Sequence, residues 1–269
     1  MTGAANPATA AADPLLQVRG LRRSFAGVHA VDGLDLDVAQ GSVTGLIGPN
    51  GCGKTTSVNC ITGFDRSFTG EVKMMEKPLA GLAPEAIARG GLMRTFQAIR
   101  VFDSFTVLEN VKLSMQSFDG TTVWQALART QQFRRTEHET ESKAYELLEL
   151  VGLRAKSHDA AGELSYGQKK LLSLAGILMS SPRLVILDEP VAGVNPTRAM
   201  EIADIIKSVK DRGTTFLVIE HNIPFVMRLC DSVVVMDRGK RLVQGPPEEI
   251  RNDPAVLEAY LGGAANVGD

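Results

Sequence analysis

The chain has 269 residues, and 44% of them are hydrophobic, which is ordinary for a globular protein with a substantial core. Its 29 lysines and arginines nearly balance its 31 aspartates and glutamates, which excludes a large field of one sign that would attract nucleic acid or anionic lipid without specificity. No stretch approaches ~20 consecutive apolar residues, so we expect no segment that spans a bilayer.

The chain ends and the cysteines indicate the cellular setting. Residues 1–14 are rich in Ala, Thr and Asn and lack a basic start followed by an apolar block, so they predict a disordered tail rather than a signal peptide. Residues 263–269 are expected to form a short C-terminal tail. The chain has three cysteines, an odd number, at Cys52, Cys60 and Cys230. They are widely spaced and have no zinc-like CxxC pattern. These features favour a reduced, cytoplasmic compartment.

In chain order, the first predicted elements are two strands at residues 15–21 and 31–38. Apolar and polar residues partly alternate there, as in half-exposed antiparallel strands. Four later segments are short, apolar and β-branched, which is typical of buried parallel strands. They span residues 43–47, 184–187, 215–219 and 232–236. Residues 237–240 predict a late hairpin turn.

The middle of the chain follows another pattern. Between about residues 108 and 152 the strand signals fade, and residues 137–151 carry apolar side chains at helical spacing with charges between them. The sequence has no internal repeat and no Gly/Ser-rich linker that would separate two domains. We therefore expect one α/β unit that carries a helical lobe.

Residues 48–55, GPNGCGKT, fit the phosphate-loop pattern GxxxxGK[ST] and lie between a predicted strand and a predicted helix. Glycines let backbone N–H groups turn inward around phosphate oxygens, and the helix adds unpaired donors and the positive end of its dipole. Lys54 would neutralise the terminal phosphates, and the Thr55 hydroxyl is placed to ligate a Mg²⁺ ion that bridges them. The alternative is a Gly-rich strand-to-helix turn without a ligand. The residues expected to surround the phosphates are Gly48, Pro49, Asn50, Gly51, Cys52, Gly53, Lys54, Thr55 and Thr56.

A second element is the apolar strand at residues 184–187, which ends in Asp188 and Glu189 at the edge where α/β sheets bind ligands. Asp188 would hold Mg²⁺ through a water molecule, and Glu189 could polarise the attacking water as a general base. Taken alone, two acids before a proline are also a common strand-ending turn.

Residues 164–168, LSYGQ, lie about two dozen residues before Asp188, and this combination resembles the signature of the ABC ATPases. The common form has glycine where this chain has Tyr166, whereas Ser165 and Gly167 are kept. Ser165 and the Gly167 backbone open a helix whose N-terminus can contact the γ-phosphate of nucleotide bound by another subunit. In isolation, the pentapeptide would be an ordinary helix cap at Ser165. The resemblance implies a nucleotide-contacting role for Ser165, Tyr166, Gly167 and Gln168.

Other motifs extend the resemblance. Residues 94–97, RTFQ, look like the Q-loop, in which Gln97 reaches Mg²⁺ and the attacking water. His221 matches the switch histidine, which contacts the γ-phosphate and helps to position water. Residues 192–196 lie where the family has its D-loop, with Asn195 where many members have Asp. Phe25 lies where the family stacks an aromatic ring on adenine, although core packing is the alternative.

The resemblance covers about residues 15–262 and implies the fold and the activity. The implied fold is α/β, with a P-loop NTPase (RecA-like) core, an N-terminal antiparallel β subdomain and a helical subdomain inserted at about residues 98–170. The implied activity is ATP hydrolysis with Mg²⁺, in which two subunits, identical or closely related, close head to tail over two ATP molecules. Permease subunits would hold the pair at the cytoplasmic face of the membrane.

The branch of the family is read from the motifs at residues 94–97, 164–168 and 192–196 and from the ending AYLG at residues 259–262. They resemble the ATPases of branched-chain amino acid importers, which implies a permease and a solute-binding protein as partners and no nucleic acid. After the signature segment this chain has Lys169 and Lys170, whereas those importer ATPases usually have Gln-Arg. The alternatives are the ATPase of a lipopolysaccharide-export system and a soluble non-transport ABC ATPase, although the latter usually has two nucleotide domains or long coiled coils.

Two further hypotheses concern single features. Residues 97–120, which include Phe102 and Phe105, are a candidate docking surface for a cytoplasmic helix of the permease, with local core packing as the alternative. Cys52 lies in the phosphate loop at a helix N-terminus, where positive potential can favour a thiolate, so thiol reagents are expected to inhibit and ATP to protect. The alternative is a small residue that is merely tolerated there.

Overall fold

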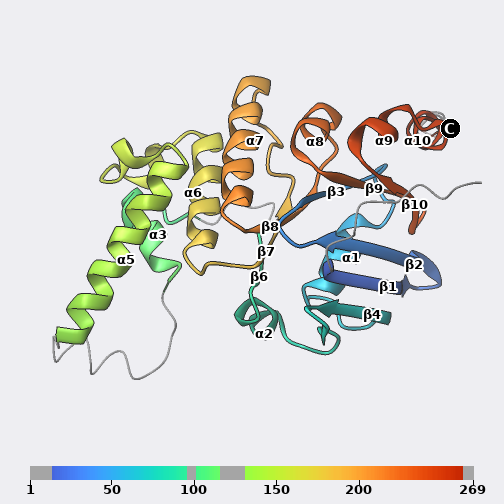
Figure 1. Ribbon diagram of the computed structural model, residues 1–269, viewed down its shortest axis with the longest axis horizontal. Helices are drawn as coiled ribbons and strands as arrows, with labels where there is room; N and C mark the ends of the chain where they lie inside the picture. Colours follow the sequence, from blue (N-terminus) through green and yellow to red (C-terminus); the bar gives the residue numbers. More distant parts are fainter. Residues whose placement is uncertain (1–13, 96–100, 116–130, 263–269) are drawn as a thin grey trace, which may run out of the picture.

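A computed structural model describes residues 14–95, 101–115 and 131–262 of the chain (Figure 1). The predicted tails, apart from Pro14, and Gln97 lie outside these residues. Within them the strands form a six-stranded sheet in the order β10-β9-β3-β8-β7-β6 and a four-stranded sheet in the order β2-β1-β4-β5. None of the helices in these ranges combines the length and apolar composition that a membrane crossing requires.

The six-stranded sheet contains the buried strands predicted from the sequence. The strands are β3 (Val43–Ile47), β6 (Leu92–Arg94), β7 (Leu184–Asp188), β8 (Thr215–Ile219), β9 (Ser232–Asp237) and β10 (Lys240–Gly245). The first five run parallel, whereas β10 returns antiparallel through the predicted hairpin turn. Every residue of β3, β7 and β8 is buried, which explains their continuous apolar runs. Because these strands are parallel, their carboxyl ends meet at one edge.

The four-stranded sheet is antiparallel, as predicted for the early strands. It consists of β1 (Pro14–Phe25), β2 (Val28–Ala39), β4 (Thr69–Met74) and β5 (Lys77–Pro78). β1 begins one residue inside the predicted tail. Alternate residues of β7 enter two different cores, because successive side chains of a strand point to opposite faces. Val185 and Leu187 join the core shared with the larger helices, whereas Leu184 and Ile186 join the core shared with the small sheet.

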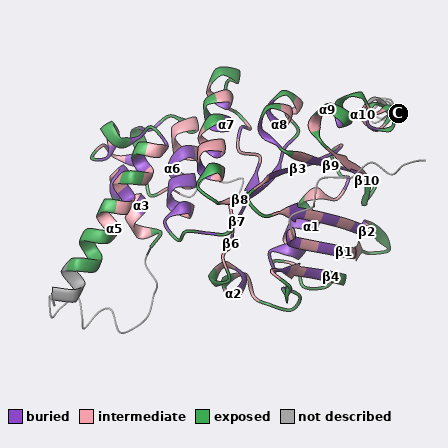
Figure 2. Cartoon of the chain, viewed as in Figure 1, coloured by how far each residue is buried: buried purple, intermediate pink, exposed green. Residues whose placement is uncertain are grey.

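Helices cover the large sheet and extend to one side of it (Figure 1). They are α1 (Lys54–Ile61), α2 (Pro84–Arg89), α3 (Val107–Leu113), α5 (Gln131–Leu150), α6 (Tyr166–Leu178), α7 (Pro196–Asp211), α8 (Ile223–Leu229), α9 (Pro247–Asn252) and α10 (Pro254–Gly262). Helices α3, α5 and α6 make up the helical lobe, and α6 packs beside α7. Figure 2 shows buried residues along the strands and the inner faces of α6 and α7, and exposed residues along much of α5. Helix α6 therefore joins the lobe to the core.

Candidate nucleotide site

The phosphate loop, residues 48–55, connects the end of β3 to the start of α1, as the sequence predicts. Gly48 and Gly53 have φ angles of 151° and 104°, in the region that disfavours other residues. A Cβ atom at Gly48 would collide with the carbonyl oxygen of Met236, and one at Gly53 would collide with that of Ala30. These two glycines are needed because the loop backbone lies directly on neighbouring backbone.

The electrostatics of the loop suit an anion. The Lys54 Nζ donates to the carbonyl oxygens of Gly48 at 2.7 Å and Pro49 at 3.0 Å, so its charge lies inside the loop. Helix α1 starts after Gly53 with no side-chain cap and no acidic residue in its first turn. The first N–H groups of a helix lack partners within it and carry the positive end of its dipole. A phosphate group fits this combination, and the exposed Thr55 lies beside it.

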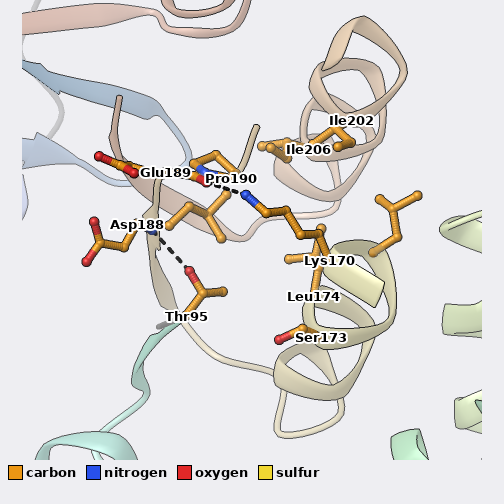
Figure 3. A pocket seen from close by; sticks show the side chains of 11 residues that line it. Thr95, Lys170, Ser173, Leu174, Asp188, Glu189, Pro190, Ile202 and Ile206 are labelled. Atoms are coloured by element: carbon orange, nitrogen blue, oxygen red, sulfur yellow. Dashed lines mark hydrogen bonds between the residues drawn. The ribbon is translucent and has the colours of Figure 1, made fainter. Parts of the chain in front are cut away.

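Asp188, at the end of β7, is held by a buried ion pair. Its Oδ2 accepts from the Arg94 guanidinium at 2.7 Å, and the two side chains are only 4% and 8% exposed. Arg94 also donates to Asn59 Oδ1 at 2.7 Å, which ties β6 to α1. The Asp188 N–H donates to Thr95 Oγ1 at 3.0 Å (Figure 3). This pair was not predicted from the sequence, although Arg94 opens the RTFQ motif.

Glu189 follows Asp188 in a left-handed conformation, with φ of 49°. Its N–H donates to the Ile219 carbonyl at 2.9 Å, and its own carbonyl accepts from Lys170 Nζ at 2.6 Å. The Glu189 carboxylate is partly exposed, and its Oε1 lies 3.7 Å from His221 Nδ1. Strands β7 and β8 pair with Asp188 opposite Ile219, so the structure confirms that His221 follows the neighbouring strand. The two side chains proposed for hydrolysis meet at the surface.

Glu220 is a structural residue that the sequence analysis missed. Its side chain is buried and accepts from the N–H groups of Val191 at 3.0 Å, His221 at 3.1 Å and Asn222 at 3.2 Å. One carboxylate therefore joins the loops that follow β7 and β8. An acid between a buried strand and a histidine is the signal that could have identified it.

The signature segment, residues 164–168, forms the start of α6. Ser165 Oγ accepts from the Gln168 N–H at 3.3 Å, and Gln168 Oε1 accepts from the Ser165 N–H at 3.0 Å, which is a capping box. The helix-cap interpretation of Ser165 is therefore correct as a description of its local contacts. Tyr166 is 50% exposed at the same end of the helix. Ser165 and Tyr166 are both exposed, so this end of the helix faces solvent.

Comparison with known proteins decides the family. Residues 31–192 match the family described as ABC transporter, and residues 240–266 match that described as branched-chain amino acid ATP-binding cassette transporter. The chain is 40% identical over 252 residues to the high-affinity branched-chain amino acid transport ATP-binding protein LivG of Salmonella typhimurium, covering 93% of this chain and 99% of that protein. BraF of Pseudomonas aeruginosa, which carries the same description, is also 40% identical over 252 residues, with the same coverage. The chain belongs to the ABC transporter ATP-binding family.

Solved structures agree with this assignment. A nucleotide-free ATP-binding cassette from an ABC transporter superposes with a TM-score of 0.79 at 34% identity, covering 95% of this chain and 100% of that one. Another ATP-binding cassette, in its ADP conformation, superposes with a TM-score of 0.78 at 31% identity, covering 93% of this chain and 99% of that one. The fold predicted from the sequence, a P-loop NTPase core with an antiparallel β subdomain and an inserted helical subdomain, is confirmed. The protein is an ABC ATPase that binds and hydrolyses ATP.

The aromatic side chains for which core packing was the alternative all lie at the surface of this ABC ATPase. Phe25 ends β1 in an exposed position, and the Arg23 guanidinium lies 4.1 Å from its ring centroid. Phe102 and Phe105 are 59% and 40% exposed and stack on each other with centroids 5.5 Å apart. Core packing, the alternative for all three, is therefore wrong.

The thiolate expected at Cys52 is contradicted. Burial raises the pKa of the Cys52 thiol, although the nearby Lys54 charge opposes this effect. Burial also raises the pKa of Cys60 to about 11 and that of Cys230 to about 12. The sequence showed the helix N-terminus but not the desolvation, which here has the larger influence.

Proposed function

We propose that this ATPase powers the uptake of branched-chain amino acids, or of related small polar solutes, through a partner permease. The observation that carries the substrate class is the similarity to LivG and BraF along almost their whole length, joined by the match of the C-terminal segment. The triphosphate of ATP would be held by the amides around Gly51 and Gly53 and by Lys54. Phe25 would stack on the adenine, since its exposed ring offers a flat apolar face.

Magnesium is the metal that this donor set suits. Thr55 offers a hydroxyl, Gln97 an amide oxygen and Asp188 a carboxylate, and Mg²⁺ prefers oxygen ligands. Arg94 occupies Oδ2 of Asp188, so the other carboxylate oxygen is the one proposed to face the metal or its water. When bound, the ion would neutralise charge on the transferred phosphoryl group.

The proposed chemistry is carried by Glu189 and His221. Glu189 takes a proton from the attacking water as that water approaches the γ-phosphate, and its partial exposure leaves the carboxylate accessible. His221 contacts the γ-phosphate and orients the water from the adjacent loop. The buried Glu220 holds both loops through three backbone N–H groups, which keeps these two side chains in register.

The second half of each site would come from another ATP-binding subunit, either a copy of this chain or a close relative. Ser165, Tyr166, Gly167 and Gln168 lie at an exposed helix N-terminus, a suitable donor for a γ-phosphate held elsewhere. Each ATP would contact both subunits and favour the closed pair, and loss of the γ-phosphate would remove that preference. Hydrolysis would then let the subunits part.

The permease would dock on the helical lobe. Phe102 and Phe105 form an exposed apolar pair beside α3, which suits an apolar face of a cytoplasmic helix from the membrane partner. The rest of the predicted docking surface falls partly outside the described residues, at 97–100 and 116–120. This arrangement would hold the ATPase at the cytoplasmic face of the membrane, with a solute-binding protein on the opposite side.

The test is transport in reconstituted vesicles. The ATPase is combined with its permease subunits and solute-binding protein, and ATP-driven uptake of radiolabelled leucine is measured, with the Glu189→Gln variant as the matched control. We expect uptake that saturates with leucine and falls to background in the variant. ATP hydrolysis that leucine and its binding protein leave unchanged, but that a lipid substrate stimulates, would replace the proposed substrate with that of an export system.

A further inference from the structure

Lys170 connects two parts of the site that are distant along the chain. It lies in the second turn of α6, the helix that begins at the signature segment, and its Nζ donates to the main-chain carbonyl of Glu189 at 2.6 Å. Figure 3 shows the side chain extending from α6 toward the backbone at Glu189 and Pro190. Helix α6 is thus hydrogen-bonded directly to the backbone of Glu189, the proposed base.

The receiving backbone is in an unfavourable conformation. Glu189 has a φ of 49°, and a residue with a Cβ atom adopts this region only when its surroundings hold it there. The Glu189 N–H is held by Ile219, and its carbonyl also accepts from the Ala192 N–H at 3.2 Å. The first of these contacts comes from the end of the neighbouring strand β8 and the second from the loop that follows β7, whereas the contact from Lys170 comes from helix α6. Movement of α6 therefore changes one of the restraints on Glu189.

The environment of Lys170 favours this contact strongly. Its side chain crosses a pocket between α6 and α7 lined by Leu174, Ile202 and Ile206. Burial lowers the pKa of the Lys170 ammonium, while the carboxylates of Glu220 and Glu189 oppose that shift. A charged group that is half withdrawn from water needs a strong acceptor, and the Glu189 carbonyl supplies one.

Lys170 also contacts the exposed signature side chain. Its Nζ lies 5.3 Å from the ring centroid of Tyr166, four residues earlier on the same helix, within the range of a cation–π interaction. The Tyr166 ring also lies against Gly193 in the loop before α7, where an added Cβ would be 3.3 Å from Tyr166 Cε1. One ammonium group therefore donates to the backbone of Glu189 and lies within cation–π range of the surface expected to meet a neighbouring nucleotide.

We propose that Lys170 is a positioning residue that couples the signature segment of a subunit to the Glu189 carboxylate of the same subunit. When Tyr166 and Ser165 engage nucleotide on the neighbouring subunit, a shift of α6 is passed through the Lys170 ammonium to the strained backbone of Glu189. Occupancy of one nucleotide site thereby sets the geometry for hydrolysis in the other. This inference rests on the roles of Glu189 and the signature segment given under the proposed function.

The experiment compares Lys170→Met, which keeps the apolar stem and removes the charge, with Lys170→Arg, which can still donate to the carbonyl. For the purified full-length chain we expect Lys170→Met to lower kcat by ~10-fold to ~100-fold while KM for ATP stays within ~2-fold. Lys170→Arg is expected to restore most of the rate. The control is Lys169→Met, which removes a surface ion pair with Asp103 at 2.7 Å and should leave kcat within ~2-fold.

A double-mutant cycle distinguishes coupling of Tyr166 to Glu189 through Lys170 from structural support of Glu189 by Lys170 alone. If Lys170 transmits the state of Tyr166, the kcat effects of Tyr166→Ala and Lys170→Met will not add, because both remove the same connection. Additive effects, an unchanged kcat in Lys170→Met, or no recovery in Lys170→Arg would each overturn the inference. So would a lower kcat that is fully explained by a lower melting temperature.

Glu189→Gln, measured in parallel, keeps this test distinct from that of the proposed function. Turnover abolished in Glu189→Gln but unchanged in Lys170→Met overturns the role of Lys170 alone. Full turnover in Glu189→Gln overturns the proposed base, and the inference about Lys170 with it.

Discussion

The two ends of the nucleotide machinery in this chain are built differently. The end formed by the phosphate loop, Asp188 and Glu189 lies on strands that are buried at every residue, and its anchoring groups, such as Glu220, are buried as well. The signature end lies at an exposed helix start, where Ser165 is satisfied by its own capping box. The first end is anchored in the core, whereas the second has a complete local structure and an exposed surface that we propose meets a second subunit.

Burial, more than residue type, therefore separates the parts proposed to act within one chain from the parts proposed to act between chains. A variant at the buried end should affect nucleotide binding or stability of a single subunit. A variant at the exposed end should affect events that require a pair of subunits and, apart from the loss of a local helix cap, leave the single subunit unchanged. Each prediction below tests one side of this division.

The largest effect is expected from loss of the loop cation. Lys54→Ala should weaken ATP binding to the single subunit by about 2–5 kcal/mol, because it removes a charge directed at the phosphates. Ser165→Ala should leave that affinity unchanged, since the signature segment is proposed to contact nucleotide on another subunit. Equilibrium titration with fluorescent ATP at concentrations where the chain is monomeric measures both. An equal loss in the two variants would contradict the division.

The next effect concerns the close backbone packing of the phosphate loop. Gly53→Ala should lower the free energy of unfolding by about 3 kcal/mol, from a collision with the Ala30 carbonyl added to the strain of a φ of 104°. Gly41→Ala is the matched control, because Gly41 has a φ of 70° but no atom within 4 Å of an added Cβ. The Gly41→Ala change should lower the free energy of unfolding by only about 1 kcal/mol. Urea denaturation of the two variants gives the comparison, and equal losses would show that the packing is not tight.

A smaller effect separates the two roles of Ser165. Ser165→Ala should lower stability by about 1 kcal/mol because the helix cap is lost, whereas Ser165→Asp keeps a capping oxygen and should stay close to the unchanged chain. Both should lose ATP-dependent pairing, since the aspartate would repel the γ-phosphate. Thermal unfolding measures the stability of each variant, and light scattering measures its ATP-dependent pairing. Normal ATP-dependent pairing of the Ser165→Asp variant would show that Ser165 acts only as a helix cap.

The smallest effect concerns the thiols. Their pKa values are raised by burial, so the native chain should react slowly with iodoacetamide at pH 8, and labelling should increase only as pH rises toward about 11 for Cys60 and about 12 for Cys230. The unfolded chain should react fast from about pH 8.5, the ordinary range of a thiol. Mass spectrometry after timed labelling locates the modified residues. Rapid labelling of Cys52 at pH 8 would show that the Lys54 charge outweighs its burial.

The sequence was sufficient for the parts of the fold that rest on local pattern. The β-branched runs at β3, β7, β8 and β9 and the octapeptide that leads into α1 are recognisable without any partner. Strand β6, Leu92–Arg94, was not predicted, because three residues are too few to show a period.

Long-range contacts of the site could not be predicted in the same way. The Arg94–Asp188 ion pair joins residues 94 positions apart, and the bond from Lys170 to Glu189 depends on how α6 crosses β7. The error at Cys52 has the same origin, because desolvation depends on packing that only the folded chain provides. Gln97 stays a prediction, since it lies outside the described residues.

The mass of the Glu189→Gln variant tests directly whether a second subunit completes the nucleotide site. Light scattering is performed with Mg²⁺ and ATP, with ADP, and on the Glu189→Gln/Ser165→Ala double variant. Each sample contains either the chain alone or the chain with a candidate second ATP-binding subunit. We predict the mass of two subunits with ATP, and of one subunit with ADP or in the double variant. A mass that is the same with ATP and ADP, or pairing that persists without Ser165, would contradict the shared site.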